Sequence, residues 1–268
     1  MPLTRSDGPS LWYSVEGDGA EAVLLVSGLG ARAADWGRRF PGALASCLRV
    51  VRFDNRGVGD SEKPEHTWTL EDMADDAVRV LDAVGVQRAH IVGVSMGGMI
   101  SQLVALNHPS RVARLVLVST HFGGPEVVRP DPRVTAIYRP PRGMTQAELM
   151  RLAAETITAP GFAARSPALV EELVQLASRQ PTPFSTFATQ LQAILSSDRS
   201  ARVKDIQAPT LVIHGELDPL IRVENGRRLA ERIPGARQVT FPDHGHLLMW
   251  EAPEELARVA LEFLRGSV

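Results

Sequence analysis

AHIVGVSMGG, residues 89–98, joins an apolar run to a serine that has a glycine two positions away on either side. The run has the length and the β-branched residues of a buried strand, and residues 96–107 form an amphipathic helical pattern. A serine at such a strand-to-helix turn has little room, and Gly93 and Gly97 relieve the crowding and lift the Ser95 hydroxyl clear of the sheet. The pattern predicts a nucleophilic serine; a glycine-rich turn that serves packing alone is the alternative.

Five further apolar runs resemble the strand before this serine, and segments with helical periodicity separate them. The runs are AVLLVSG (22–28), LRVVRFD (48–54), RLVLVST (114–120), PTLVIHG (209–215) and RQVTF (237–241). Residues 69–85, for example, begin with threonine and acidic residues and end at a glycine, as a helix does. Strands that alternate with helices predict an α/β fold with a mostly parallel sheet, in which ligands bind beyond the carboxyl ends of the strands.

Residues 122–203 interrupt this alternation. They contain prolines, glycines and helical patterns at 146–158 and 167–178, but no convincing strand. Apolar residues recur at helical spacing in LVEELVQLA and FATQLQAIL, which disfavours a disordered linker. We therefore expect a helical cap over the strand ends of a core domain that comprises residues 1–121 and 204–268.

Composition narrows the range of partners. A chain of 268 residues can form one large α/β domain, and a net charge of -2 gives no reason to expect nucleic acid or an anionic membrane. The single Cys47 excludes an internal disulfide and a multi-cysteine zinc site. The N-terminus lacks the apolar segment of a secretory signal, and no apolar run reaches the length of a membrane span. We expect a cytoplasmic protein that binds a small molecule; a homo-oligomer is compatible with the sequence.

A serine hydroxyl becomes a nucleophile when a base takes its proton and a carboxylate orients that base. Candidates for both follow other predicted strands: Asp218 follows PTLVIHG, and His244 and His246 follow RQVTF. The chain order of serine, acid and histidine is typical of one particular fold.

The chain resembles the α/β-hydrolase fold family along nearly its whole length. GVSMGG corresponds to the nucleophile elbow, HGELDP to the acid loop and GHLLMWEAPEE to the histidine loop. Within the family the chain is similar to cofactor-free esterases, enol-lactonases and haloperoxidase-like enzymes, and to polyketide methylesterases. Epoxide hydrolases and haloalkane dehalogenases share the fold but carry aspartate at the elbow, so Ser95 argues against both.

The resemblance implies a catalytic triad of Ser95, Asp218 and His246 that needs no cofactor, with His244 as a spectator. It implies hydrolysis of a carboxylic ester or lactone of a mainly apolar small molecule through an acyl-enzyme. Two alternatives stay open: the same triad used for C–C bond hydrolysis, lyase or perhydrolase chemistry, and a ligand receptor without catalysis.

The loop SGLG, residues 27–30, corresponds to the family's H-G-x-G loop. The resemblance implies that the main-chain N–H groups of Leu29 and Met96 form the oxyanion hole. Ser27 replaces the usual histidine, which puts the rigidity of this loop in question.

Four residues are candidates for the substrate pocket. Gly28 belongs to the oxyanion loop, and His121 directly follows a strand; Trp36 is either a core residue or pocket wall, and Tyr138 lies in the predicted cap. The aromatic residues of the cap suggest an apolar pocket; they are Tyr138, Phe162, Phe184 and Phe187.

The remaining polar candidates have simpler interpretations. Asp54, Arg56 and Gly57 match a family loop and are expected to support its architecture, and Asp60 and Asp243 are weaker rivals of Asp218 as the acid. The histidines expected to be structural or solvated are His66, His90 and His108, and the His214 imidazole is expected to be packed or bonded to the backbone. The H-x-H pair lacks a third and a fourth ligand at metal-site spacing, so no metal is expected. No nucleotide-binding motif is present either.

Overall fold

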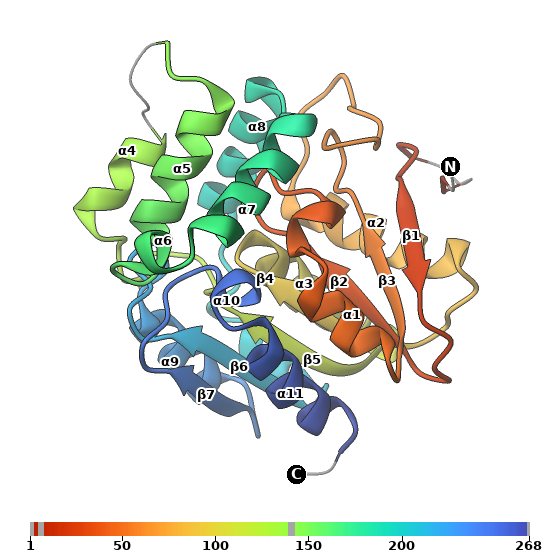
Figure 1. The fold of residues 1–268 in the computed structure, drawn as a ribbon. Helices are drawn as coiled ribbons and strands as arrows, with labels where there is room; N and C mark the ends of the chain where they lie inside the picture. The colour runs from red at the N-terminus through yellow and green to blue at the C-terminus, as the bar shows by residue number, and fades with distance from the viewer. Residues whose placement is uncertain (1–2, 5–7, 139–142, 267–268) are drawn as a thin grey trace.

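The computed structural model describes residues 3–4, 8–138 and 143–266, and it contains a seven-stranded sheet with the order β1-β3-β2-β4-β5-β6-β7 (Figure 1). The strands are β1 (Tyr13–Glu16), β2 (Ala22–Val26), β3 (Arg49–Phe53), β4 (Ala89–Val94), β5 (Val112–Val118), β6 (Thr210–Gly215) and β7 (Arg237–Phe241). The strands from β2 to β7 pair in parallel, so the predicted α/β fold with a mostly parallel sheet is confirmed. The sequence patterns missed β1, which pairs antiparallel with β3 at the sheet edge and is partly exposed.

Helices cover both faces of the sheet (Figure 1). They are α1 (Arg39–Ala45), α2 (Leu70–Ala83), α3 (Met96–Asn107), α9 (Val223–Arg232), α10 (Leu248–Glu251) and α11 (Pro253–Leu264). Side chains of α2, α3 and α9 share one apolar core with the sheet, and those of α1, α10 and α11 share the other. Thr69 caps α2, because its hydroxyl accepts a hydrogen bond from the Asp72 N–H at 3.2 Å.

Helix α3 has the predicted bounds but not the predicted amphipathic character. All of its residues from Met96 to Ala105 are buried, because the helix lies between α2 and strands β4 and β5. A helix that is apolar on every side is typical of a position inside a layered core.

Residues 122–203, which we call the cap, leave the sheet after β5 and return before β6. The cap helices are α4 (Thr135–Tyr138), α5 (Gln146–Ile157), α6 (Phe162–Arg165), α7 (Pro167–Arg179) and α8 (Phe184–Ser196), with a short 3-10 turn at Pro132–Val134. A second 3-10 turn, Val203–Asp205, lies where the chain returns from the cap to the core. Helices α5, α6 and α7 pack around a small apolar core of their own, whereas α8 contacts α2 of the main layer. Residues 139–142 lie outside the described part, and the domain division at residues 121/122 and 203/204 stays a prediction.

The two ends of the cap lie side by side. Gly123 and Asp198 form an isolated antiparallel bridge, and the Arg199 N–H donates to the Phe122 carbonyl at 2.8 Å. The cap therefore rises from a narrow base at the carboxyl end of β5.

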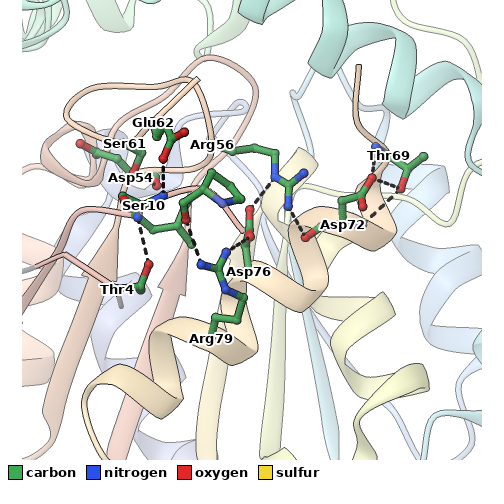
Figure 2. A network of polar contacts seen from close by, with 12 residues as sticks. Thr4, Ser10, Asp54, Arg56, Ser61, Glu62, Thr69, Asp72, Asp76 and Arg79 are labelled. Atoms are coloured by element: carbon green, nitrogen blue, oxygen red, sulfur yellow. Dashed lines mark hydrogen bonds and ion pairs between the residues drawn. The ribbon is translucent and has the colours of Figure 1, made fainter. Parts of the chain in front are cut away.

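Polar contacts hold the loop after β3, and Figure 2 shows those that join it to α2 and to the segment before β1. The Asp54 carboxylate accepts hydrogen bonds from the main-chain N–H groups of Ala33 at 2.7 Å and Asp60 at 3.2 Å. The Arg56 guanidinium forms a buried ion pair with Asp76 on α2 at 2.6 Å. These contacts are those expected of residues that support loop architecture.

Within the described ranges, no helix has both the length and the apolar character that crossing a membrane requires.

Candidate active site

Ser95 lies between β4 and α3 with φ 55° and ψ -120°, a left-handed conformation that L residues rarely adopt. The glycines around it leave no room for a side chain. A Cβ atom at Gly97 would lie 2.0 Å from the Val26 carbonyl oxygen, and one at Gly93 would lie 2.3 Å from the Ser101 hydroxyl. The crowded turn predicted from the sequence is therefore present, and the strained conformation projects Ser95 from the end of a buried strand.

Asp218 and His246 are in direct contact. His246 Nδ1 lies 2.7 Å from Asp218 Oδ2, and both residues are buried. The second carboxylate oxygen, Oδ1, accepts main-chain N–H groups from Leu220 and Ile221, each at 2.9 Å. Because Nδ1 is engaged by the carboxylate, Nε2 is the nitrogen left to exchange protons with another group.

The pKa of Asp218 is low despite its burial. Burial by itself raises this pKa, but the charge of His246 and hydrogen bonds from His214 and His246 outweigh it and lower the pKa to about 2. Asp218 is consequently ionised throughout the range in which a histidine titrates.

His214 is a contact of the acid that the sequence did not reveal. Its Nε2 lies 2.7 Å from the Ile221 carbonyl, which confirms the expected backbone bond, and 3.5 Å from Asp218 Oδ2. His214 lies near the end of β6, and Asp218 follows four residues later in the next loop. This short spacing could have suggested that the two side chains are close. His214 Nε2 and His246 Nδ1 therefore both lie near the same carboxylate oxygen, Asp218 Oδ2.

The loop that carries His246, residues 242–247, is fixed by a half-buried glutamate that sequence reasoning also missed. Glu251 accepts main-chain N–H groups from Gly245 at 2.9 Å and Leu247 at 3.0 Å, and from Ala159 of the cap at 2.8 Å. Burial raises the pKa of Glu251, although these hydrogen bonds act against the shift. An acidic residue within the apolar segment LLMWEAP was the available signal.

The histidine loop also contacts the cap backbone directly. The His246 N–H donates to the Ile157 carbonyl at 2.8 Å, and a Cβ atom at Gly245 would lie 2.5 Å from the Thr158 carbonyl carbon. Glycine is required at this position because the two backbones touch.

The oxyanion loop, residues 27–32, lies against the nucleophile. A Cβ atom at Gly28 would be 3.3 Å from the Ser95 Cβ. Ser27, which stands in place of the family's histidine, accepts a hydrogen bond from the Trp36 indole N–H at 3.0 Å and donates to the Arg32 carbonyl at 3.4 Å. The Ser27 hydroxyl thus connects the start of the oxyanion loop to its end at Arg32 and to Trp36 of the core.

Trp36 was one of four candidates for the substrate pocket, with the core as its other predicted location. The structure places it in the core, where it is 2 % exposed and its ring stacks on Phe40 at 5.5 Å between centroids. The Trp36 indole N–H donates to the Ser27 hydroxyl. Of the two predicted locations, the core is the one observed.

His121 and Tyr138 lie near charged groups of this region. His121 Nδ1 accepts the Gly123 N–H at 2.9 Å, and burial, reinforced by the charges of Arg199 and His214, lowers its pKa to about 3. Burial and the charge of Asp218 raise the pKa of Tyr138 to about 12. Both side chains are therefore neutral near pH 7.

The cap aromatics do not share one environment. Phe184 is 82 % exposed at the start of α8, so it is not among the cap aromatics that face inward, a distinction that the sequence left open. Phe162 is buried in the cap's own apolar core. Phe187 packs close to Gly30, where an added Cβ atom would lie 3.3 Å from its ring, and its ring lies 6.5 Å from that of Tyr138.

The rival polar residues lie in other settings. Asp60 accepts the Gln180 side-chain amide at 3.1 Å, and Asp243 is exposed. His244 is half-buried, with its ring edge-on to Phe241. No group of three or more His, Cys, Asp or Glu side chains that could hold a metal ion occurs in the described part of the chain.

Comparison with known proteins matches residues 21–253 to a family model described as alpha/beta hydrolase fold. A protein of Caulobacter sp. (strain K31) named "Putative carbamate hydrolase RutD" is 33% identical, with 96% of each chain covered. The 2-hydroxy-6-oxononadienedioate/2-hydroxy-6-oxononatrienedioate hydrolase of Burkholderia vietnamiensis (strain G4 / LMG 22486) is 32% identical, over 94% of this chain and 90% of that protein. The solved enol-lactonase from Burkholderia xenovorans LB400 superposes with a TM-score of 0.86 and 26% identity, covering 98% of this chain and 100% of the other.

Proposed function

Because the chain belongs to the alpha/beta hydrolase fold family and its relatives include an enol-lactonase, we propose that it hydrolyses a carboxylic ester or lactone of a mainly apolar small molecule through an acyl-enzyme on Ser95. The observation that carries the proposal is the buried His246–Asp218 contact of 2.7 Å, which orients an imidazole at the same edge of the sheet, the carboxyl ends of the parallel strands, as Ser95. The proposed reaction needs no cofactor.

The proposed reaction uses each group in a defined role. His246 Nε2 removes the proton of Ser95, and Oγ attacks the substrate carbonyl carbon. Asp218 holds the imidazole in the required tautomer and stabilises the imidazolium that forms. The N–H groups of Leu29 and Met96 stabilise the oxyanion.

The tetrahedral intermediate collapses when the bond to the leaving oxygen breaks and His246 gives its proton to that oxygen. His246 then removes a proton from water, whose oxygen attacks the acyl carbon, and the Ser95 oxygen leaves with that proton. The products are a carboxylic acid and an alcohol, which for a lactone are the two ends of one molecule.

The preference for an apolar substrate is supported by the neutral aromatic groups near the loops. Tyr138 is kept neutral by burial and by Asp218, and its ring neighbours Phe187, which packs on the oxyanion loop. The relatives that act on carbamates and on C–C bonds make those bonds the alternatives to an ester or lactone.

The test combines covalent labelling with a substrate panel. A fluorophosphonate should add to Ser95 of the wild type and not to Ser95→Ala, as read by intact-protein and peptide mass spectrometry. The panel should hold p-nitrophenyl esters and lactones of graded chain length, a carbamate and a β-diketone. We expect esters or lactones to be turned over fastest, with a loss of about 10⁴ to 10⁶ in Ser95→Ala. Faster cleavage of the β-diketone or carbamate would contradict the proposed substrate class, and ester hydrolysis by Ser95→Ala would contradict the nucleophile.

A further inference from the structure

The cap binds the oxyanion loop at Gly30. The Gly30 N–H donates to Gln190 Oε1 at 2.8 Å, and the Gly30 carbonyl accepts the Thr182 hydroxyl at 2.7 Å. Gln190 lies on α8 and is fully buried, and Thr182 lies just before the same helix. Two cap side chains thus hold both main-chain polar groups of one loop residue.

This residue directly follows Leu29, whose N–H is the proposed oxyanion donor. Peptide units are planar, so only the two backbone dihedral angles of Leu29 separate the donor's peptide unit from the unit that Gln190 holds. The direction of the donor N–H therefore depends on how the Gly30 end of the loop is fixed.

Among the described residues, side chains of the core domain bond this loop, residues 27–32, at its two ends and not at Gly30. At the later end, Asp35 accepts the Arg32 N–H at 2.9 Å. Asn55 donates to the Ser27 carbonyl at 3.2 Å, and Trp36 donates to the Ser27 hydroxyl. Between these contacts and Gly30, a turn joins the Ala31 N–H to the Gly28 carbonyl at 3.2 Å. Core contacts define where the loop begins and ends, and cap contacts define where it passes Leu29.

The side-chain chemistry of Gln190 favours a role for its oxygen. An N–H group can only donate, so the amide must turn Oε1 toward Gly30. In this orientation Nε2 is buried and has no hydrogen-bond partner among the described residues, which is unfavourable for a polar group. An apolar side chain would avoid that cost but could not hold the loop.

We propose that Gln190 and Thr182 are positioning residues, through which the docked cap completes the oxyanion hole by fixing the Leu29 peptide. The inference rests on the proposed serine-hydrolase function. It assigns the cap a part in transition-state stabilisation in addition to enclosing the substrate.

The experiment compares Thr182→Val and Gln190→Met, which remove the two contacts with little change of shape, with Thr182→Ser, which keeps the hydroxyl. The steady-state constants are measured on the ester or lactone that the wild type hydrolyses fastest, along with inhibition by a trifluoromethyl ketone of matching chain length. Complete loss of an oxyanion donor costs about 10² to 10³ in turnover, so a misplaced donor should lower kcat by about 10-fold to 10²-fold. We expect KM to stay within about twofold and the ketone's inhibition constant to rise by the same factor as kcat falls, because only tetrahedral species use the hole. Thr182→Ser should resemble the wild type.

Thr186→Val is the matched control. Thr186 lies on the same face of α8, one turn before Gln190, is fully buried, and donates to the Gly57 carbonyl at 3.1 Å. This substitution removes a cap-to-core hydrogen bond of the same kind, but from a loop without a proposed oxyanion donor. A loss of kcat in Thr186→Val equal to that in Thr182→Val would overturn the proposal in favour of general cap stability.

Two other outcomes also count against it: unchanged kcat in both Thr182→Val and Gln190→Met, or a change confined to KM. Fluorophosphonate labelling of the wild type separates these results from a failure of the proposed function. A labelled wild type with unaffected variants overturns only the role of the cap, whereas an unlabelled wild type that hydrolyses esters overturns the acyl-enzyme mechanism.

Discussion

The histidine loop and the oxyanion loop both leave the sheet at the carboxyl ends of strands, and both contact the cap, but they are held in different ways. The histidine loop contacts the cap through its backbone. The carboxylate of Glu251, a core residue, accepts N–H groups from both the histidine loop and the cap. The oxyanion loop receives side chains of the cap, Gln190 and Thr182, at its Gly30 end. Because a core residue fixes the contact between the histidine loop and the cap, only the position of the oxyanion loop should depend on which side chains the cap carries.

The largest effect should come from the base within the histidine loop. His246→Ala removes the group that accepts the serine proton, and kcat should fall by about 10⁴ to 10⁶ in ester or lactone hydrolysis. The control is His244→Ala, two residues away, which should keep most of the activity. Comparable losses in both variants would show that the two imidazoles act together.

Glu251→Gln should weaken the histidine loop. Each Glu251 oxygen accepts at least one main-chain N–H, so an amide would set its own N–H₂ against a donor. We expect a loss of about 1 to 3 kcal/mol in the free energy of unfolding, measured by urea denaturation, and a lower kcat.

Glu254→Gln is a suitable comparison for that variant, because Glu254 is exposed near the start of α11 and should change stability by less than about 0.5 kcal/mol. Equal stabilities of the two variants would mean that the Glu251 contacts do not hold the loop.

Ser27→Ala probes the core side of the oxyanion loop. It leaves the buried indole N–H of Trp36 without its acceptor, and the cost should be about 1 kcal/mol in urea denaturation. The cap contacts at Gly30 remain, so kcat should fall less than in Gln190→Met. A greater kcat loss in Ser27→Ala would reverse the assignment of the cap as the part that fixes Leu29.

At the base of the cap we expect a pH dependence of stability. The pKa of His121 is about 3 in the folded protein and near 6.5 when unfolded, so the unfolded chain binds more protons between these values. Stability should therefore fall as the pH drops below about 6.5, by at most about 1.4 kcal/mol per pH unit from this group. His121→Asn keeps an acceptor for the Gly123 N–H but cannot titrate, and urea denaturation from pH 4 to 7 should show a shallower slope. An unchanged slope would assign the pH dependence to other groups.

Local sequence patterns predicted the six parallel strands because a sheet covered on both faces needs continuous apolar runs. They also predicted the elbow at Ser95, because steric crowding there requires glycines in the sequence neighbourhood itself. The strands that they follow placed Asp218 and the His244/His246 pair, the family resemblance selected His246, and the structure puts Asp218 and His246 in contact. Strand β1 escaped prediction because it is four residues long and half-buried at an edge.

The sequence by itself therefore determined the layered α/β fold and the candidate triad, since each rests on residues close together in the chain or on the order of strands. Only the tertiary structure decided which groups hold those residues. Gln190 and Gly30 are 160 positions apart, and Glu251 and Ala159 are 92 apart. The sequence around one partner does not indicate the other, because a hydrogen bond between distant segments depends on how the cap packs on the core. The exposure of Phe184 has the same origin. A helix could be predicted in this segment, but packing determined which side of the helix faces the core.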